Sequence, residues 1–133
     1  MPTKVLLVNT AEETVREARE LTPPDFELIV APPGGPGYAE ALADTEYLLG
    51  NVSTMDEAFY RAAPSLKLVQ LLSAGYDDVD LEAARRAKVP VSNNGGANAI
   101  SVSEHAMMLM LTVARKVVWQ HASVSGEIGR AHV

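Results

Sequence analysis

Short apolar runs alternate along the chain with longer segments of helical character. Residues 5–8 form a continuous apolar run that ends at Asn9, as expected of a parallel strand buried on both faces. The next segment, residues 11–21, is rich in helix formers and carries Val15 and Ala18 at helical spacing. The pattern therefore predicts a strand followed by a helix at the start of the chain.

The same alternation continues to the end of the chain. Further strands are predicted at residues 26–30, 47–50, 67–72 and 89–92, and residues 31–37 form a loop of proline and glycine. Helices are predicted at residues 54–63, 81–88 and 101–122. Their starts are marked by a capping box at Thr54 and Glu57, by Asp80, and by a capping box at Ser101 and Glu104. Alternating strands and helices of these lengths predict an α/β fold, with a parallel sheet covered by helices on both faces.

The last predicted helix is apolar all round rather than along one stripe, most clearly over residues 106–114. Such a helix is expected to be covered on more than one side, and the rest of the chain is too short to enclose it. We therefore expect it to meet another domain or a second subunit. We interpret its methionines as packing residues rather than as an adaptable binding face.

Composition narrows the class of protein. Hydrophobic residues make up 47% of the 133 residues and charged residues 21%, which is typical of a globular domain. The net charge is −6, and no basic stripe is present, so nucleic acid is not expected as a partner. The chain has no cysteine, which excludes disulfides and thiolate chemistry and agrees with a cytoplasmic setting. The three histidines show no metal-ligand spacing, and the apolar stretch in the long helix is too short to span a membrane.

Ligands of open α/β sheets bind beyond the carboxyl ends of the strands, and two loops there are candidate ligand-binding loops. Residues 73–80 begin Ser-Ala-Gly-Tyr, whose small residues would let backbone N–H groups approach a carboxylate. The alternative is a tight turn that leads to a helix capped by Asp80. Residues 93–98 lead into the long helix and end at Asn98, whose amide is either a substrate contact or a helix cap.

Two segments resemble the D-2-hydroxyacid dehydrogenase family. Residues 66–86 resemble a strand that ends in the small-residue turn Gly-x-Asp-x-x-Asp, and residues 91–106 resemble the following strand, Asn, Gly, Asn, Val-Ala-Glu-His. The strong match covers residues 64–124. Gly95 stands where the family usually has proline, and Ser103 stands where it has alanine.

This resemblance implies a flavodoxin-like substrate domain built from both ends of the chain, with a Rossmann domain inserted after the long helix and the substrate held in the cleft between them. It implies that Ala74, Gly75 and Tyr76 bind the substrate carboxylate, that Asn98 contacts the substrate, and that Val102 packs near the nicotinamide. It also implies NAD or NADP as cofactor, a small 2-hydroxy or 2-oxo acid as substrate, and a homodimer.

We accordingly expect residues 1–98 to be the N-terminal portion of an incomplete substrate-binding domain and residues 99–124 an interdomain helix that leads to a missing Rossmann domain. The sequence has no Gly-x-Gly-x-x-Gly after that helix, and the family's catalytic Arg, Glu and His come later, so we assign no catalytic residue and expect the chain alone to be inactive. Residues 127–133 read like a translated sequencing adapter, and we expect a non-native tail there.

Two other hypotheses belong to different classes. The first is a free-standing flavodoxin-like binding or regulatory module. A phosphorylated receiver would need an acidic cluster after the first strand and an aspartate after the third, where Asn9-Thr10 and Gly50-Asn51 stand instead. The second is a subunit-interface element based on the long helix.

Overall fold

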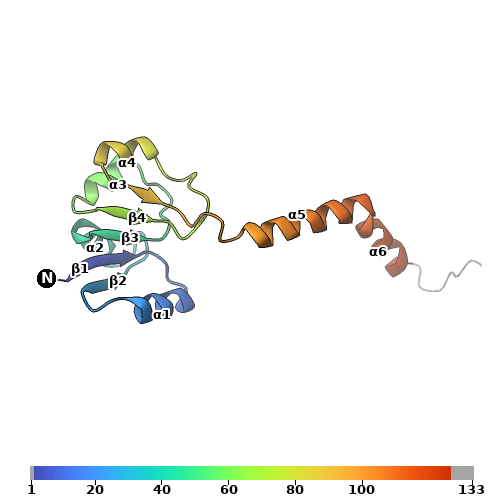
Figure 1. Ribbon diagram of the computed structural model, residues 1–133, viewed down its shortest axis with the longest axis horizontal. Helices are drawn as coiled ribbons and strands as arrows, with labels where there is room; N and C mark the ends of the chain where they lie inside the picture. The colour runs from blue at the N-terminus through green and yellow to red at the C-terminus, as the bar shows by residue number, and fades with distance from the viewer. Residues whose placement is uncertain (1, 127–133) are drawn as a thin grey trace, which may run out of the picture. The chain divides into compact units, whose positions relative to one another are not determined.

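The computed structural model describes residues 2–126, which divide into one unit that ends at Gly95 and a second that begins at Gly96. The first unit holds a five-stranded sheet in the order β2-β1-β3-β4-β5, with every pairing parallel. The strands are β1 (Thr3–Leu7), β2 (Phe26–Val30), β3 (Tyr47–Leu49), β4 (Leu68–Gln70) and β5 (Val91–Ser92). Four helices connect them: α1 (Glu12–Leu21), α2 (Tyr38–Asp44), α3 (Glu57–Ala62) and α4 (Leu81–Ala87). This strand order is that of the flavodoxin-like fold, and the predicted α/β class is confirmed (Figure 1).

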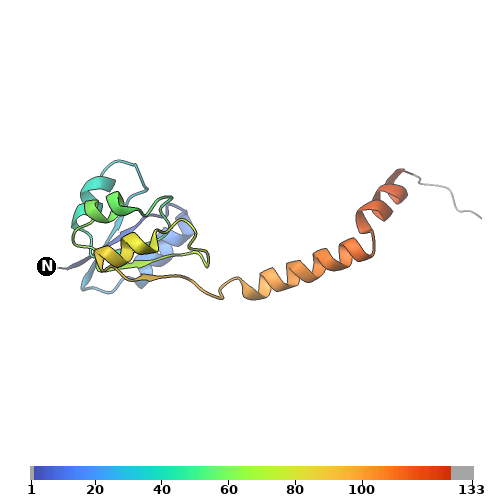
Figure 2. The same ribbon diagram turned by 90° about the horizontal axis from the view of Figure 1, so that it is seen from above.

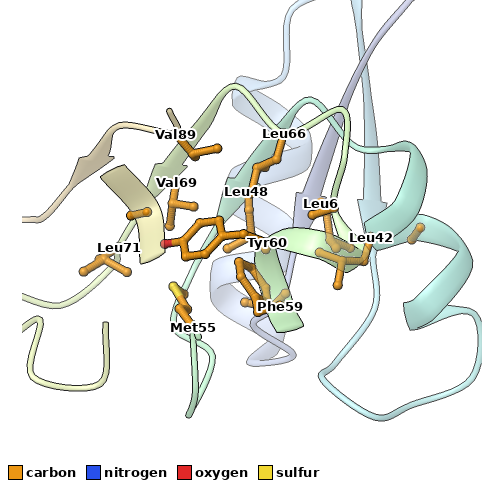
Figure 3. Packing of buried hydrophobic residues seen from close by; sticks show 14 of the residues in the cluster. Leu6, Leu42, Leu48, Met55, Phe59, Tyr60, Leu66, Val69, Leu71 and Val89 are labelled. Carbon is orange, nitrogen blue, oxygen red and sulfur yellow. The ribbon is translucent and has the colours of Figure 1, made fainter. Parts of the chain in front are cut away.

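One face of the sheet carries the core. Leu6, Leu48 and Val69 come from the middle of three neighbouring strands, and none of them is exposed to solvent. They pack in one cluster with apolar residues of α2, α3 and α4, so these three helices cover the same face. Figure 3 shows the rings of Phe59 and Tyr60 in the middle of this cluster, and the two rings meet edge to face at 5.1 Å.

The opposite face is covered only in part. Val5 and Leu7 alternate with Leu6 along β1 and are buried outside the main cluster. Here α1 and the β1–β2 part of the sheet surround a shallow, almost wholly apolar hollow of about 300 Å³. Leu49 and Leu68, which point to this face from β3 and β4, stay partly exposed. Helices therefore lie on both faces, but within the described residues the second face is incomplete.

Several predicted boundaries need correction. The fourth and fifth strands are shorter than residues 67–72 and 89–92. Pro90 explains the fifth strand, because it has no N–H and only accepts, from Val69, at 3.0 Å. The helix α2 was not predicted at all, since residues 38–44 are a short run directly after a loop of glycine and proline. Its buried residues Ala41 and Leu42 join the core.

The capping box at Thr54 and Glu57 was also predicted wrongly. The helix α3 begins at Glu57, and Asp56 caps it by accepting a hydrogen bond from the Phe59 N–H at 3.0 Å. Thr54 cannot act as cap because Met55, which is 1% exposed, forms a parallel bridge with Val79 and holds the chain extended up to Asp56. The cap of α4 by Asp80 is as predicted, with an oxygen 2.9 Å from the Ala83 N–H.

The second unit consists of two helices, α5 (Ala99–Ala114) and α6 (Val117–Gly126) (Figure 2). The single helix predicted over residues 101–122 is therefore wrong in two respects. It begins before Ser101, with Asn98 at the N-cap position, and it breaks at Lys116, whose φ of 51° lies in the left-handed region. No glycine or proline marks this break in the sequence.

The second unit by itself buries none of its apolar side chains. Met107, Met110 and Trp119 are each more than 60% exposed, so the all-round covering expected for residues 106–114 is not supplied by the second unit itself. Between residues 2 and 126, neither these helices nor any other is long and apolar enough to cross a membrane. The tail expected at residues 127–133 lies outside the described residues.

Candidate substrate-binding site

Three loops meet at the carboxyl end of the sheet in the first unit. They follow the neighbouring strands β3, β4 and β5, and hydrogen bonds tie the outer two to the central one. Asn51 after β3 accepts from the Leu72 N–H at 3.2 Å, and Asn93 after β5 donates from Nδ2 to the Ala74 carbonyl at 2.7 Å. The two loops that the sequence singled out are therefore brought together, and the third was not predicted.

The central loop is held by its carbonyl groups. Four consecutive carbonyl oxygens, those of residues 73–76, each accept a hydrogen bond. The donors are the Asn94 N–H to Ser73 at 2.9 Å, Asn93 Nδ2 to Ala74, the Ser73 hydroxyl to Gly75 at 2.7 Å, and the Val79 N–H to Tyr76 at 3.0 Å. None of these four donor groups belongs to a helix or to one of the five strands of the sheet. The loop is thus held in place through its carbonyl groups.

The N–H groups of the same four residues are free. Within the described part of the chain, the N–H groups of Ser73, Ala74, Gly75 and Tyr76 donate no hydrogen bond. An amide donor normally finds a protein or water partner, so a run of free donors is suited to an anion. Ala74 and Ser73 are partly buried, and Gly75 and Tyr76 are exposed.

Three of the four residues that carry the free N–H groups border a cavity of about 250 Å³. Gly75, Tyr76 and Ser73 line it from the central loop, with Asn51 and Val52 from the loop after β3. Its remaining wall includes Met55, Leu71, Asp77, Asp78 and Val79. A cavity of this size suits a molecule of few heavy atoms. The ring of Tyr76, which is 53% exposed, also borders a separate hollow of about 380 Å³ against Leu71, Leu81 and Val91.

Gly50 shapes the loop after β3. Its φ is 119°, a region that side chains rarely adopt, and its N–H donates to Gln70 at 2.9 Å. This bend directs the chain from the end of β3 toward the loop after β4. Asn51 is the functional candidate that sequence reasoning missed. The available signal was its position, directly after a predicted strand that neighbours β4.

In the second unit, Asn98 and Val102 lie one helical turn apart at the start of α5. The Asn98 carbonyl accepts from the Val102 N–H at 2.9 Å. The Asn98 side chain makes no capping hydrogen bond, although it occupies the N-cap position. The alternative that its amide is used as a helix cap is therefore not supported. Both side chains are exposed, and residues four apart lie on one helix face.

Burial raises the pKa of the Tyr38 and Tyr60 hydroxyls, and the charged groups with shifted pKa values lie at the opposite, amino end of the sheet. A hydrogen bond from Lys67 lowers the pKa of Glu46, and the same bond raises the pKa of Lys67. A hydrogen bond to Asp44 raises the pKa of Lys4. These exposed pairs join the start of the strands and belong to the fold rather than to the candidate site.

The sequence as a whole supports one family. Residues 5–127 match the family model described as D-isomer specific 2-hydroxyacid dehydrogenase, catalytic domain. The chain belongs to this family. The resemblance seen in the loops after β4 and β5 is thereby confirmed, and it extends over most of the chain.

The curated relatives that the chain resembles include two reductases. It is 33% identical over 81 residues to glyoxylate/hydroxypyruvate reductase B of Salmonella agona, which covers 61% of the chain and 25% of that protein. It is 31% identical over 115 residues to the same enzyme of Escherichia fergusonii, which covers 86% of the chain and 33% of that protein. The chain thus spans a quarter to a third of the length of these relatives.

Solved structures agree in fold. The NAD-dependent formate dehydrogenase of Staphylococcus aureus in complex with NAD is 27% identical, with a TM-score of 0.73 over 94% of the chain and 42% of that protein. The D-mandelate dehydrogenase of Rhodotorula graminis superposes with a TM-score of 0.77 over 96% of the chain and 42% of that protein. At 23% identity this second likeness shows the fold alone.

The described residues show neither a metal cluster nor the acidic groups of a phosphorylated receiver. Between residues 2 and 126, no three His, Asp or Glu side chains gather as a metal site would require. The ends of β1 and β3 carry Asn9 and Asn51 where a phosphorylated receiver would need acidic groups. The loop after β4 carries a run of free amide donors within a family motif.

Proposed function

We propose that this chain is the substrate-binding segment of an NAD(P)-dependent oxidoreductase that interconverts a D-2-hydroxy acid and its 2-oxo acid. The observation that carries the proposal is the loop of residues 73–76, whose carbonyls are all engaged and whose amides are all free. Family membership supports it, and so do the reductases that the chain resembles.

The carboxylate is the group that every 2-hydroxy acid shares. We assign its recognition to the backbone N–H groups of Ala74, Gly75 and Tyr76. Hydrogen bonds to an ionised acceptor are about twice as strong as neutral ones, and several N–H donors on one carboxylate fix its plane. A fixed carboxylate orients the neighbouring C2 atom for reaction. Asp77 and Asp78 line the same cavity, so the amide donors must also offset the repulsion of these carboxylates.

Asn98 and Val102 have roles that follow from the family motif. We propose that the free amide of Asn98 donates to the substrate and that Val102 packs near the nicotinamide. The exposure of both side chains and the absence of a capping bond from Asn98 support this assignment.

NAD or NADP would supply the hydride in the complete enzyme, but the residues of this chain do not form a dinucleotide site. The sequence has no Gly-x-Gly-x-x-Gly, and the glycines at 35 and 37 lie among prolines, which offer no N–H to a phosphate. We therefore derive no hydride or proton step from this chain, and we expect it alone neither to bind the cofactor tightly nor to turn over substrate.

The partners follow from the same proposal. We expect a small 2-hydroxy or 2-oxo acid as substrate, a cytoplasmic setting, no nucleic-acid partner, and a homodimer of the complete enzyme. The exposed apolar side chains of α5 support self-association, since such a surface is costly in water. Sedimentation of the complete enzyme at several concentrations tests the expected homodimer, and a monomer at every concentration would overturn it.

The test of the proposed function has two arms. In the dehydrogenase that carries this chain, NADH and NADPH oxidation is followed with glyoxylate, hydroxypyruvate and larger 2-oxo acids. Turnover of at least one is expected, and turnover of none would overturn the proposal. In the chain itself, oxamate, an unreactive mimic of a 2-oxo acid, is titrated while amide resonances are recorded. The N–H signals of Ala74, Gly75 and Tyr76 are expected to move most.

A further inference from the structure

The loop after β4 is connected to Asn51 by a directed chain of hydrogen bonds. The Asn51 carboxamide oxygen accepts from the Leu72 N–H at 3.2 Å. Its Nδ2 donates to the Ser73 hydroxyl oxygen at 2.6 Å, and that hydroxyl donates to the Gly75 carbonyl at 2.7 Å. The chain runs from the loop after β3, through one side chain, to the middle of the loop whose amides are free.

The direction of each bond is fixed by the groups involved. The Leu72 N–H can only donate, so it faces the oxygen of the Asn51 carboxamide and turns Nδ2 toward Ser73. Because Nδ2 can only donate, the Ser73 oxygen accepts, and its single proton is left for the Gly75 carbonyl. Neither side chain can reverse its part without breaking a contact at the other end.

The end of this chain is the peptide group that joins Gly75 to Tyr76. Its carbonyl accepts from Ser73, and its N–H is one of the free donors. A hydrogen bond accepted by a peptide carbonyl polarises the whole group and strengthens its N–H as a donor. The peptide between Ala74 and Gly75 is in the same situation, since Asn93 donates to the Ala74 carbonyl.

We propose that Asn51 is a positioning residue of the substrate site, acting through Ser73 to fix and polarise the Gly75–Tyr76 peptide for the substrate carboxylate. The inference rests on the proposed function and deepens it. Asn51 does not need to touch the substrate in this role. The two side chains act together, because the bond that Asn51 donates to the Ser73 oxygen orients the Ser73 proton toward the Gly75 carbonyl.

The test compares four variants in the dehydrogenase that carries this chain: Asn51→Ala, Ser73→Ala, the double variant, and Ser73→Thr, which keeps the hydroxyl. Ser53→Ala is the control, since Ser53 is an exposed residue of the same loop with no side-chain hydrogen bond among the described residues. The Michaelis constants for the 2-oxo acid and for the cofactor are measured together with kcat.

Each single alanine variant is expected to raise KM for the 2-oxo acid roughly fivefold to tenfold, as the loss of one hydrogen bond to the binding loop does. KM for the cofactor and kcat should stay within about twofold, because the loss is in substrate binding. The double variant should be no worse than either single one, whereas independent contributions would multiply. Ser73→Thr should restore most of the affinity.

Three results would overturn the inference: multiplied effects in the double variant, an effect of Asn51→Ala without one of Ser73→Ala, or a loss of kcat alone. The second would mean that Asn51 contacts the substrate directly. Failure of the proposed function is seen separately, in the unmodified enzyme. In that case the Tyr76 amide resonance of the chain itself still tests the relay, since Asn51→Ala and Ser73→Ala must shift it alike and Ser53→Ala must not.

Discussion

Gly50 lies so close to Val8 that a Cβ atom on Gly50 would come within 2.6 Å of Val8 Cγ2. The contact joins the ends of β1 and β3 and sets the bend that leads to Asn51. Since the φ of Gly50 is also positive, at 119°, two separate costs oppose any side chain there.

Gly50→Ala is therefore expected to destabilise the first unit by roughly 2–4 kcal/mol, combining backbone strain with overpacking. Gly34→Ala is the matched control, because Gly34 also has a positive φ, 73°, but open space around its Cα. It should cost only about 1 kcal/mol. Urea unfolding followed by circular dichroism measures both, and equal losses would contradict the close contact with Val8.

The start of α3 distinguishes the observed cap from the one that the sequence suggested. Asp56→Ala removes the acceptor of the Phe59 N–H and should cost about 1 kcal/mol. Thr54→Ala, at the residue of the expected capping box, should change the free energy of unfolding by less than about 0.5 kcal/mol. A larger loss from Thr54→Ala than from Asp56→Ala, measured by chemical denaturation, would reverse the assignment.

Buried Thr45 tests how much a hydrogen-bonded hydroxyl at the edge of the core contributes to the free energy of unfolding. Its side chain is fully buried, and the hydroxyl donates to the Tyr47 carbonyl at 3.0 Å with a longer approach of 3.3 Å to the Lys4 carbonyl. Thr45→Val keeps the shape and removes the hydroxyl donor from the Tyr47 carbonyl, while the Lys4 carbonyl keeps its bond from the Glu46 N–H, so a loss of about 1–2 kcal/mol is expected. Exposed Thr10→Val serves as control in the same thermal unfolding series, and a neutral Thr45→Val would show that the hydroxyl contributes nothing.

The Glu46–Lys67 ion pair makes the free energy of unfolding depend on pH in the acidic range. The folded-state pKa of Glu46 is lowered from its ordinary value of 4.5, so the pair stabilises the fold above 4.5 and this contribution is lost as pH falls through the lowered pKa. Glu46→Gln should reduce the urea midpoint at neutral pH, by a small amount since the pair is at the surface. The difference from the unmodified chain should vanish well below pH 4.5. Glu17→Gln, on the exposed face of α1, is the control, and its urea midpoint should stay close to that of the unmodified chain at neutral pH.

Asn93 offers a prediction on ligand binding. Asn93→Ala removes the donor to the Ala74 carbonyl and frees the loop on the β5 side, so the affinity for oxamate should fall by roughly 1 kcal/mol, about fivefold. Thr10→Ala, at the same end of the sheet but in the loop after β1, should bind as the unmodified chain does. Unchanged binding after Asn93→Ala, measured by titration of amide resonances, would remove this side chain from the site.

The sheet could be predicted from the sequence because buried parallel strands leave a strong local signal. The apolar runs near Leu6 and Leu48 identify their strands, and β-α alternation then restricts the sheet to parallel pairing. Two features had no local signal. The helix break at Lys116 contains neither glycine nor proline, and α2 is shorter than the periodicity needed to detect it.

The candidate site was predictable in part for the same reason. Small residues after β4 pointed to Ala74 and Gly75, because such residues leave backbone amides accessible. The contribution of Asn51 depends on a contact with Ser73, 22 residues further along the chain. That contact requires β3 to lie next to β4 with Leu49 opposite Gln70, which the sequence does not specify.

A site that binds its ligand through backbone N–H groups keeps these donors when its side chains are replaced. Every peptide between Ser73 and Asp77 offers the same N–H whatever side chain accompanies it. Replacement of Tyr76 therefore alters the shape and polarity of the two hollows that its side chain borders, while the backbone N–H donors persist. Under the proposed function, homologous enzymes can in this way diverge in the acids that they accept while the N–H donors of the loop stay the same.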